Sequence, residues 1–212
     1  TSHLESGSAP TMSLSRNVLD VARRFSTAPT APEVFSVSVK AMHWGVGVGI
    51  LGCFGTVQAA MYTTKDYKPI PGYVKGDLMN LHKSFGLLIG AAVVPRLAVR
   101  ALSTAPAHLP GPYLLNLAAD ASHVLKYALM IAMPATGIAM GYFGGKGLPF
   151  FGYTIPGASA ENKNGKLAGQ AFWLHKNAGQ IFEYTTLLHV GAAGLHVVKG
   201  QAIFRRIVPG LY

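Results

Sequence analysis

The sequence predicts an all-α integral membrane protein, a bundle of four transmembrane helices with both termini on the same side. The first observation is composition: half of the 212 residues are hydrophobic and only 12% are charged, about half the charged share of an ordinary soluble domain. The second is four long apolar stretches, at residues 38–62, 78–102, 114–143 and 171–199. Each has the roughly 20 residues that a helix needs to cross a bilayer.

Three parts are expected along the chain. Residues 1–37 form an N-terminal leader or amphipathic extension, residues 38–200 the membrane domain, and residues 201–212 a C-terminal tail. Residues 11–29 place apolar side chains on one helical face and are rich in Ser, Ala and Arg with one acidic residue. This composition is typical of a mitochondrial presequence. A retained leader would lie at the membrane interface as an amphipathic helix.

The distribution of basic residues predicts the orientation. An even number of spans places both termini and the loop at 103–113 on one side, and that side holds every arginine of the chain. We therefore expect the termini in the matrix if the membrane is the mitochondrial inner membrane, or in the cytoplasm if it is a bacterial-type plasma membrane. The formal charge of +10 lies beside the spans without interleaved aromatics, so membrane lipid is the expected partner and nucleic acid is not.

A few charged or reactive residues fall inside the predicted spans. The second span includes Pro95 and Arg96, and the third includes Asp120 and Lys126. These charges are expected toward helix ends, where long side chains reach the interface. Cys53, in the first span, is the only cysteine, so no intrachain disulfide can form and a packing role is expected.

The fourth span carries three histidines, His175, His189 and His196. Fourteen residues of α-helix turn through about 1400°, close to four full turns, and rise about 21 Å. His175 and His189 therefore face the same way at two depths, and His196 lies near that face closer to the terminal side. A single intramembrane histidine is usually an interhelical hydrogen-bonding group, but three on one face favour a function, because ionisable groups in a bilayer are costly.

Histidines in other spans match these depths. His82 and His175 each lie about four residues inside their apolar segments, on the side away from the termini. His43 lies eleven residues beyond Pro32, a candidate helix-start proline. His43 and His189 are then both expected about 15 Å from their helix ends. The spacing thus predicts one histidine pair at each of two levels.

Two stacked pairs of histidines are what two b-type haems require. Each iron takes two axial imidazoles and keeps no open position for dioxygen or substrate, which suits electron transfer. One ambiguity remains at the level near the termini. His123 lies eleven residues beyond Pro112 and reaches the same depth as His43, so spacing alone allows either to face His189.

Other features of the spans are less specific. Small residues let a flat macrocycle or a neighbouring helix approach closely, and five glycines line the first span: Gly45, Gly47, Gly49, Gly52 and Gly55. Zinc fits less well, because it needs a third or fourth ligand at one level. The chain has no GxSxG, P-loop or HExxH motif, so hydrolysis, phosphoryl transfer and zinc proteolysis have no support.

At this point the chain resembles a known family. The motifs are HW at 43–44, LHKSFGLLIGAAVVPRLAVRA at 81–101, SHVLKYALMIAMPATGIAMGYF at 122–143, and LHK followed fourteen residues later by LLH. Together with the loop at 147–167, they are similar to the bacterial-type cytochrome b561 family over about residues 38–200. Members of this family are four-helix membrane proteins with two haems.

The resemblance implies which histidines are haem ligands. Residue by residue, it makes His43 with His189 the axial pair of one haem, the inner haem near the termini. It makes His82 with His175 the pair of the other, outer haem. It thereby decides against His123 as a ligand.

The resemblance also implies an activity, the oxidation of superoxide with electrons passing through the haems to ubiquinone. Superoxide is an anion, so basic side chains near the outer haem are expected to steer it: Lys83, Lys176, Lys163 and Lys166. On the quinone side, His123 and His196 are left without a haem. Asp120, His123 and Lys126 follow one another at threefold spacing and could form a proton path.

Two features depart from the family pattern: the leader, which bacterial members lack, and the single His196 before Val197, where a double histidine is common. Two other functions stay open. One is a haem-bearing membrane subunit that passes electrons between quinol and a separate redox partner. The other is a haem-free accessory subunit bound within a respiratory-chain complex, against which the retention of all four candidate ligands argues.

Overall fold

The computed structural model describes residues 34–211, and the presequence-like stretch at 11–29 lies outside them. Residues 34–211 form four long helices, a short hairpin and a final short helix. These are α2 (Val37–Tyr62), α3 (Lys75–Ala101), α4 (Tyr113–Phe143), β1 (Leu148–Phe150), β2 (Tyr153–Ile155), α5 (Gly165–Val198) and α6 (Ile203–Ile207). The predicted helical class is confirmed, and each predicted apolar stretch lies almost wholly within one long helix.

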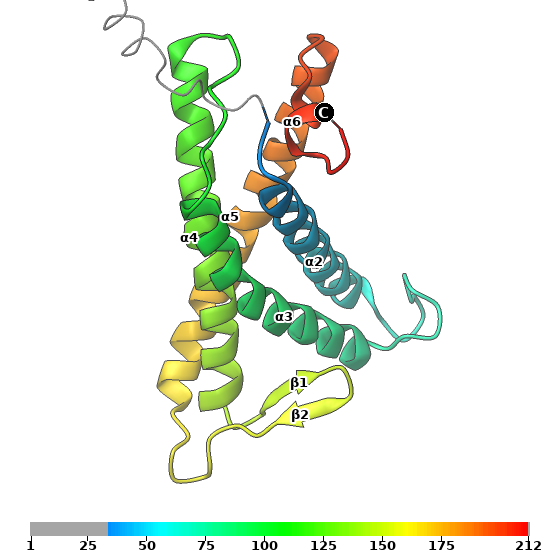
Figure 1. The fold of residues 1–212 in the computed structure, drawn as a ribbon. Helices are drawn as coiled ribbons and strands as arrows, with labels where there is room; N and C mark the ends of the chain where they lie inside the picture. Colours follow the sequence, from blue (N-terminus) through cyan, green and yellow to red (C-terminus); the bar gives the residue numbers. More distant parts are fainter. Residues whose placement is uncertain (1–33, 212) are drawn as a thin grey trace, which may run out of the picture.

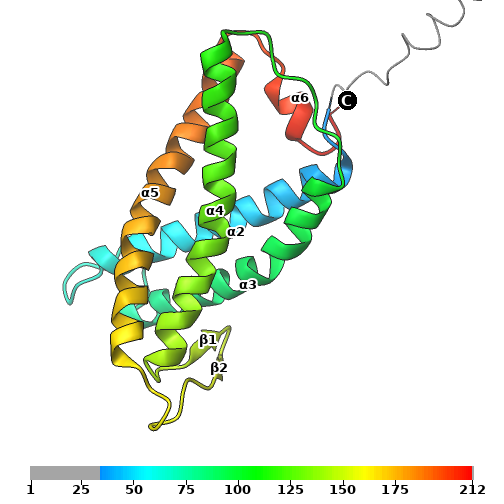
Figure 2. The same ribbon diagram turned by 90° about the vertical axis from the view of Figure 1, so that its left-hand side faces the viewer.

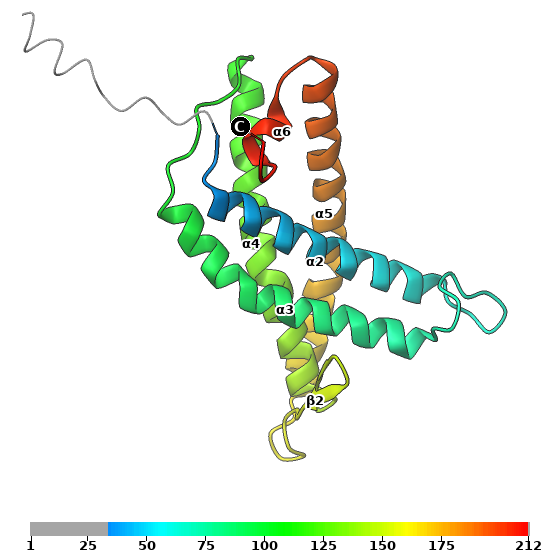
Figure 3. The same cartoon turned by 45° about the vertical axis from the view of Figure 1, so that its right-hand side comes forward.

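The long helices are arranged as two antiparallel pairs. α2 packs along α3, and α4 packs along α5 (Figure 1). The pairs do not lie parallel to each other: α2 and α3 cross the direction of α4 and α5, most clearly in Figure 3. Contacts between the pairs run mainly through α3 and α4. A Cβ atom at Gly90 of α3 would lie 3.0 Å from the Cβ of Pro134 in α4, so the backbones approach closely there.

Local hydrogen bonds set where the helices begin. The Ser36 hydroxyl accepts a hydrogen bond from the amide of Val39, so α2 begins at Val37 and not at Pro32, which lies outside the described residues. α4 begins directly after Pro112, as expected. The Asn164 side chain caps α5, and this cap starts the helix six residues before the apolar stretch that predicted it.

The buried core is small and lies where the two pairs meet. It is a cluster with members from all four long helices: Val46, Cys53, Ile89, Val93, Leu129, Met130, Ala178 and Phe182. Cys53 therefore packs as expected. Gly49 and Gly52 also serve packing, since Cβ atoms there would lie 3.1 Å and 3.3 Å from side-chain atoms of Ile89 and Phe85.

Large apolar side chains are exposed over most of the remaining helix surface; Val94, Val124 and Leu188 are 70%, 69% and 72% exposed. Such continuous apolar faces are what a bilayer covers. α2, α3 and α4 are each long and apolar enough to cross a membrane. α5 is the longest helix, but its histidines, Lys176 and Glu183 lower its hydropathy, and a fourth crossing through α5 stays a prediction.

The start of α2 and the C-terminal segment lie together. The amide of Phe35 donates to the Arg206 carbonyl at 3.2 Å, and the Trp44 indole donates to the Ile207 carbonyl at 3.0 Å. The buried Lys40 ammonium donates to two further carbonyls of the segment. Figure 2 shows α6 against the first turns of α2, beside the end of α3. The two ends of the described chain therefore meet at one end of the molecule.

A β-hairpin occupies the segment at 147–167, for which no strand was predicted. β1 and β2 pair antiparallel with Phe150 opposite Tyr153. The two turn residues, Phe151 and Gly152, both have positive φ, at 43° and 95°, as a tight hairpin turn requires. The Phe151 amide donates to the buried Ser84 hydroxyl at 2.9 Å, which fixes the hairpin to α3 close to His82.

Candidate functional site

His82 of α3 and His175 of α5 face each other near the hairpin end of the molecule. Their ring centroids are 6.2 Å apart. An imidazole nitrogen binds a metal at about 2 Å and lies about 1 Å from its own ring centroid, so two imidazoles on opposite sides of one iron have centroids about 6 Å apart. The structure thus brings together the two residues predicted for the outer haem, at a separation that fits one iron.

Hydrogen bonds fix which nitrogen of each ring is free. His82 Nδ1 lies 3.0 Å from the Cys53 carbonyl oxygen, which can only accept, so Nδ1 carries the proton. His175 Nδ1 lies 3.0 Å from the Thr136 hydroxyl. That hydroxyl donates its own proton to the Ala132 carbonyl at 2.7 Å, so it accepts from His175. Both rings therefore present an unprotonated Nε2, the atom that binds iron when Nδ1 is held by an acceptor.

The second group of histidines contains three rings. His43 of α2 and His189 of α5 have centroids 6.2 Å apart, and His123 of α4 lies 5.7 Å from His189. The structure brings the predicted inner pair together at the same separation as the outer pair. It also keeps His123 within reach, so the ambiguity left by spacing persists in three dimensions.

The histidines are the candidate metal ligands of the site. In the part of the chain that the structure describes, no group of three or more His, Cys, Asp or Glu side chains is placed to hold a metal ion. A b-type haem needs only two protein ligands. Gly137 lets α4 approach the outer pair, because a Cβ there would lie 3.3 Å from the His175 ring.

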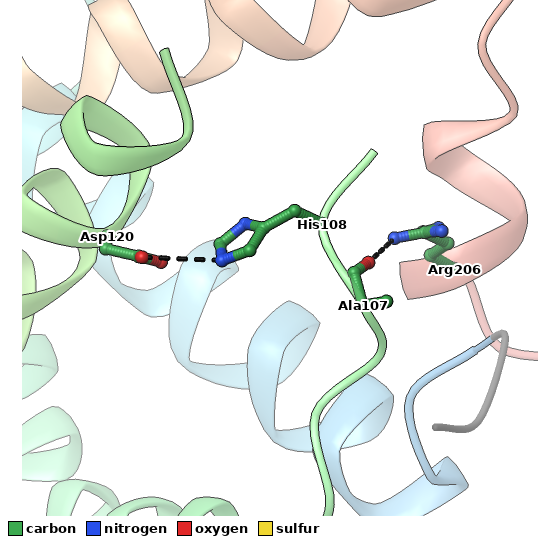
Figure 4. A network of polar contacts seen from close by, with 4 residues as sticks. All are labelled: Ala107, His108, Asp120 and Arg206. Carbon is green, nitrogen blue, oxygen red and sulfur yellow. Dashed lines mark hydrogen bonds and ion pairs between the residues drawn. The ribbon is translucent and has the colours of Figure 1, made fainter. Parts of the chain in front are cut away.

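The residues predicted for the proton path have other partners. Asp120 pairs with His108 of the preceding loop at 3.4 Å (Figure 4), and the Lys126 ammonium donates to the Ser122 hydroxyl. His196 Nδ1 contacts the Gln201 side chain. The structure therefore holds these groups near the C-terminal end of the molecule but does not join Asp120, His123 and Lys126 into one hydrogen-bonded chain.

The same loop is tied to the C-terminal segment. Arg206 of α6 donates to the Ala107 carbonyl at 2.6 Å, one residue from His108 (Figure 4). The Gln201 side chain also donates to the Pro110 carbonyl at 3.3 Å. The loop between α3 and α4 and the segment after α5 thus form one connected surface beside the inner histidines.

Arg96 departs from the expectation that it reaches toward the interface. Its Nη1 donates to the Met42 carbonyl at 2.6 Å, and its Nε is buried without a hydrogen-bond partner. The side chain therefore turns inward from α3 toward α2, beside His43. The expectation was wrong because a position near a helix end does not fix the direction in which a long side chain extends.

The lysines predicted to steer an anion lie at the hairpin end of the chain. Lys83 directly follows His82 and is half-buried, and the other three are exposed. Sequence reasoning missed a neighbour, Lys146, which lines an open cavity of about 490 Å³ between the start of α3 and the hairpin. The cavity is also lined by Leu81, next to His82. Lys146 lies near His82 only because the hairpin folds against α3, which no local sequence pattern indicates.

A second missed group is a carboxylate on α5. Both oxygens of Glu183 accept hydrogen bonds from the Gln58 amide of α2, at 2.8 Å and 2.9 Å. These residues line a mostly apolar cavity of about 430 Å³. The sequence contains one signal that could have revealed this group: Glu183 is an acidic residue inside an apolar stretch.

Comparison with known proteins gives the family. The family model of prokaryotic cytochrome b561 matches residues 34–210, nearly the whole described chain. The chain belongs to the prokaryotic cytochrome b561 family. Membership assigns it to b-type haem proteins that transfer electrons across membranes, and it agrees with three apolar helices long enough to span one.

Individual members of the cytochrome b561 family are distant relatives. The chain is 31% identical to "Cytochrome b561 homolog 2" of Escherichia coli (strain K12) over 147 residues, 68% of this chain and 76% of that one. It is 26% identical to "Probable superoxide oxidase CybB" of Yersinia pestis over 168 residues, 77% of this chain and 90% of that one. At these identities the comparisons support an oxidoreductase without fixing its substrates.

Proposed function

We propose that this cytochrome b561 passes electrons across a membrane through two b haems, oxidising superoxide at the hairpin end and reducing ubiquinone at the end where the termini meet. The observation that carries the proposal is the outer pair. His82 and His175 face each other with centroids 6.2 Å apart, and the Nδ1 of each is held by an acceptor. A relative described as a probable superoxide oxidase supports the choice of donor.

The axial ligands would be His82 with His175 for the outer haem and His43 with His189 for the inner haem. Each haem held by two histidines would supply one-electron transfer. The acceptors on the outer rings, the Cys53 carbonyl and the Thr136 hydroxyl, orient Nε2 and increase the basicity of the imidazoles.

At the hairpin end, basic side chains would raise the local concentration of superoxide: Lys83, Lys176, Lys163 and Lys166. Lys146, on the wall of the open cavity beside Leu81, would act with them. No contact between superoxide and iron is needed, since an electron can enter at the edge of a haem. Steering by exposed charges weakens as ionic strength rises, so the rate of superoxide oxidation should fall with added salt.

At the other end, His123 and His196 would hydrogen-bond the quinone and deliver protons. The His196 contact with Gln201 orients that ring at the end of α5. Asp120 and Lys126 would exchange protons with water, since Asp120 is exposed and faces His108. Two protons are required for each quinone reduced by two electrons.

The proposal includes four membrane crossings, with α5 as the fourth. Its histidines and Glu183 are partly buried, and they would face the protein interior and not lipid. The presequence-like residues 11–29 favour the mitochondrial inner membrane with the ends in the matrix. A bacterial-type plasma membrane with cytoplasmic ends is the alternative, and association with a respiratory-chain complex is compatible with both.

A reduced-minus-oxidised spectrum with pyridine-haem quantification on the purified chain tests the proposal. We expect two b haems per chain, reduced by superoxide and reoxidised by added ubiquinone in the same cuvette. Two haems that superoxide does not reduce would leave an electron carrier with a different donor. A chain without haem would contradict the proposal and favour a haem-free accessory subunit.

A further inference from the structure

The guanidinium of Arg96 lies where three helices meet. It extends from α3, donates from Nη1 to the Met42 carbonyl of α2 at 2.6 Å, and lies over the ring of Tyr127 in α4 with its Cζ 5.9 Å from the ring centroid. The guanidinium is therefore turned toward α2 and α4, and the side chain is partly buried between them.

Arg96 is partly buried and has no carboxylate partner among residues 34–211. Arg96 Nε is the only buried side-chain nitrogen or oxygen among residues 34–211 without a hydrogen-bond partner. The only ion pair in that part of the chain joins His108 and Asp120. A charged group inside a membrane protein normally pairs with another group, because leaving it unpaired is costly. The unpaired Nε thus leaves a donor available to an anionic ligand.

The position of Arg96 along the helices indicates which anionic ligand it would meet. Met42 directly precedes His43, and Tyr127 lies one turn beyond His123. The guanidinium is therefore beside the inner group of histidines. The next arginine on α3 differs, because Arg100 Nη1 donates to the Ser103 carbonyl and its guanidinium lies over the Phe35 ring. Only Arg96 keeps a buried donor unused.

We propose that Arg96 binds a propionate carboxylate of the inner haem. The inference rests on the proposed function, which places a haem between His43 and His189. Each b haem carries two propionates, and Nε together with one Nη nitrogen of a guanidinium matches both oxygens of a carboxylate. A neutral quinone oxygen would not balance the charge. A lipid phosphate would stay at the headgroup level, which the buried Nε of a guanidinium turned toward α2 does not reach.

The test compares three variants with the wild-type holoprotein: Arg96→Gln, Arg96→Lys and, as the matched control, Arg100→Gln. Haem per chain, the midpoint potential of each haem and the propionate bending bands in resonance Raman spectra are measured. In Arg96→Gln we expect the inner haem to be partly lost or to have a lowered potential, because removing a positive charge favours ferric iron. Its propionate band shifts, and the outer haem is unchanged.

The Lys variant separates charge from packing. Arg96→Lys keeps the charge but not the paired donors, so the inner potential should stay near that of the wild type while the propionate band still shifts. Arg100→Gln should leave both readouts unchanged. Two wild-type haems whose potentials and propionate bands do not respond to either Arg96 variant would overturn this inference and leave the proposed function intact. A wild-type chain without b haem would overturn both.

Discussion

At the residue scale, the two histidine groups differ in how their rings are held. His82 and His175 each have Nδ1 hydrogen-bonded to an oxygen. No ring nitrogen of His43 or His189 has a hydrogen bond within residues 34–211. A hydrogen bond at Nδ1 makes an imidazole a stronger electron donor to iron. The outer haem should therefore have axial ligands of higher basicity than the inner one.

Thr136→Val tests this difference, because valine keeps the shape of threonine and removes the acceptor at His175. We expect the outer haem to be retained and its midpoint potential to rise, since a less basic imidazole stabilises ferric iron less. One hydrogen bond contributes about 1 kcal/mol, so the upper limit is about 40 mV for a one-electron couple. Spectroelectrochemical titration measures the shift.

Thr186→Val is the control for Thr136→Val. The Thr186 hydroxyl donates to the Phe182 carbonyl one turn back, as Thr136 does to Ala132, but it has no hydrogen bond to a histidine within residues 34–211. An equal shift in both variants would mean that helix packing, and not the hydrogen bond to His175, sets the potential.

Single substitutions can also show whether His43 or His123 is the partner of His189 at the inner haem. We expect His43→Ala to reduce the haem content from two per chain to one, because the inner iron loses an axial ligand. His123→Ala should keep both haems, and quinone reduction alone should slow. Pyridine-haem quantification distinguishes the variants. The reverse pattern would make His123, whose ring lies 5.7 Å from that of His189, the inner ligand.

At the element scale, the sequence predicted the helices well because an apolar stretch of span length has few other structures available. α2, α4 and the end of α3 lie within one residue of their predicted limits. The start of α5 was missed because the Asn164 cap extends the helix beyond its apolar part. The hairpin was missed because its strands have three residues each, too few for an alternating pattern.

The crossing of the two helix pairs was not predictable from periodicity, which gives the face of a helix but not the angle of its neighbour. Where α3 and α4 meet, a Cβ atom at Gly90 would lie 3.0 Å from the Cβ of Pro134. We expect Gly90→Val to lower the free energy of unfolding by about 1–3 kcal/mol, since the added methyls would overlap Pro134. Thermal unfolding in detergent, followed by circular dichroism, measures the loss.

Gly169→Val in α5 is the control for Gly90→Val, because a Cβ at Gly169 meets no atom within 4 Å. Both variants place valine in a helix, so the difference between them isolates the contact between α3 and α4. Equal destabilisation would indicate that helix propensity alone is responsible.

At the scale of the whole molecule, residue depth predicted that His82 lies opposite His175 and left His43 and His123 as alternatives opposite His189, because depth along a straight helix follows directly from residue number. The rest of the site depends on contacts between distant segments. Glu183 with Gln58, Arg96 with Met42, and Lys146 beside the outer histidine helix join residues whose proximity no local pattern contains. The meeting of α6 with the start of α2 likewise joins the two ends of the described chain.

The number of crossings is a property of the whole molecule, and labelling can measure it. With α5 as a fourth span, the loop after α3 and the segment after α5 lie on one side, and the loops after α2 and α4 lie on the other. Single cysteines at exposed positions would report the side: Thr104→Cys and Ala202→Cys for the first, Lys68→Cys and Asn162→Cys for the second. The native Cys53 is buried and serves as the unlabelled control.

An impermeant maleimide added to sealed vesicles of known orientation should label Thr104→Cys and Ala202→Cys together, and the other two variants only from the opposite side. Because α5 connects Asn162 to Ala202, it must cross the bilayer if these two positions are labelled from opposite sides. Labelling of Asn162→Cys and Ala202→Cys from the same side would show that α5 does not span the bilayer. The histidines of α5 would then lie in an interfacial helix, and two haems at different membrane depths could not be held by it.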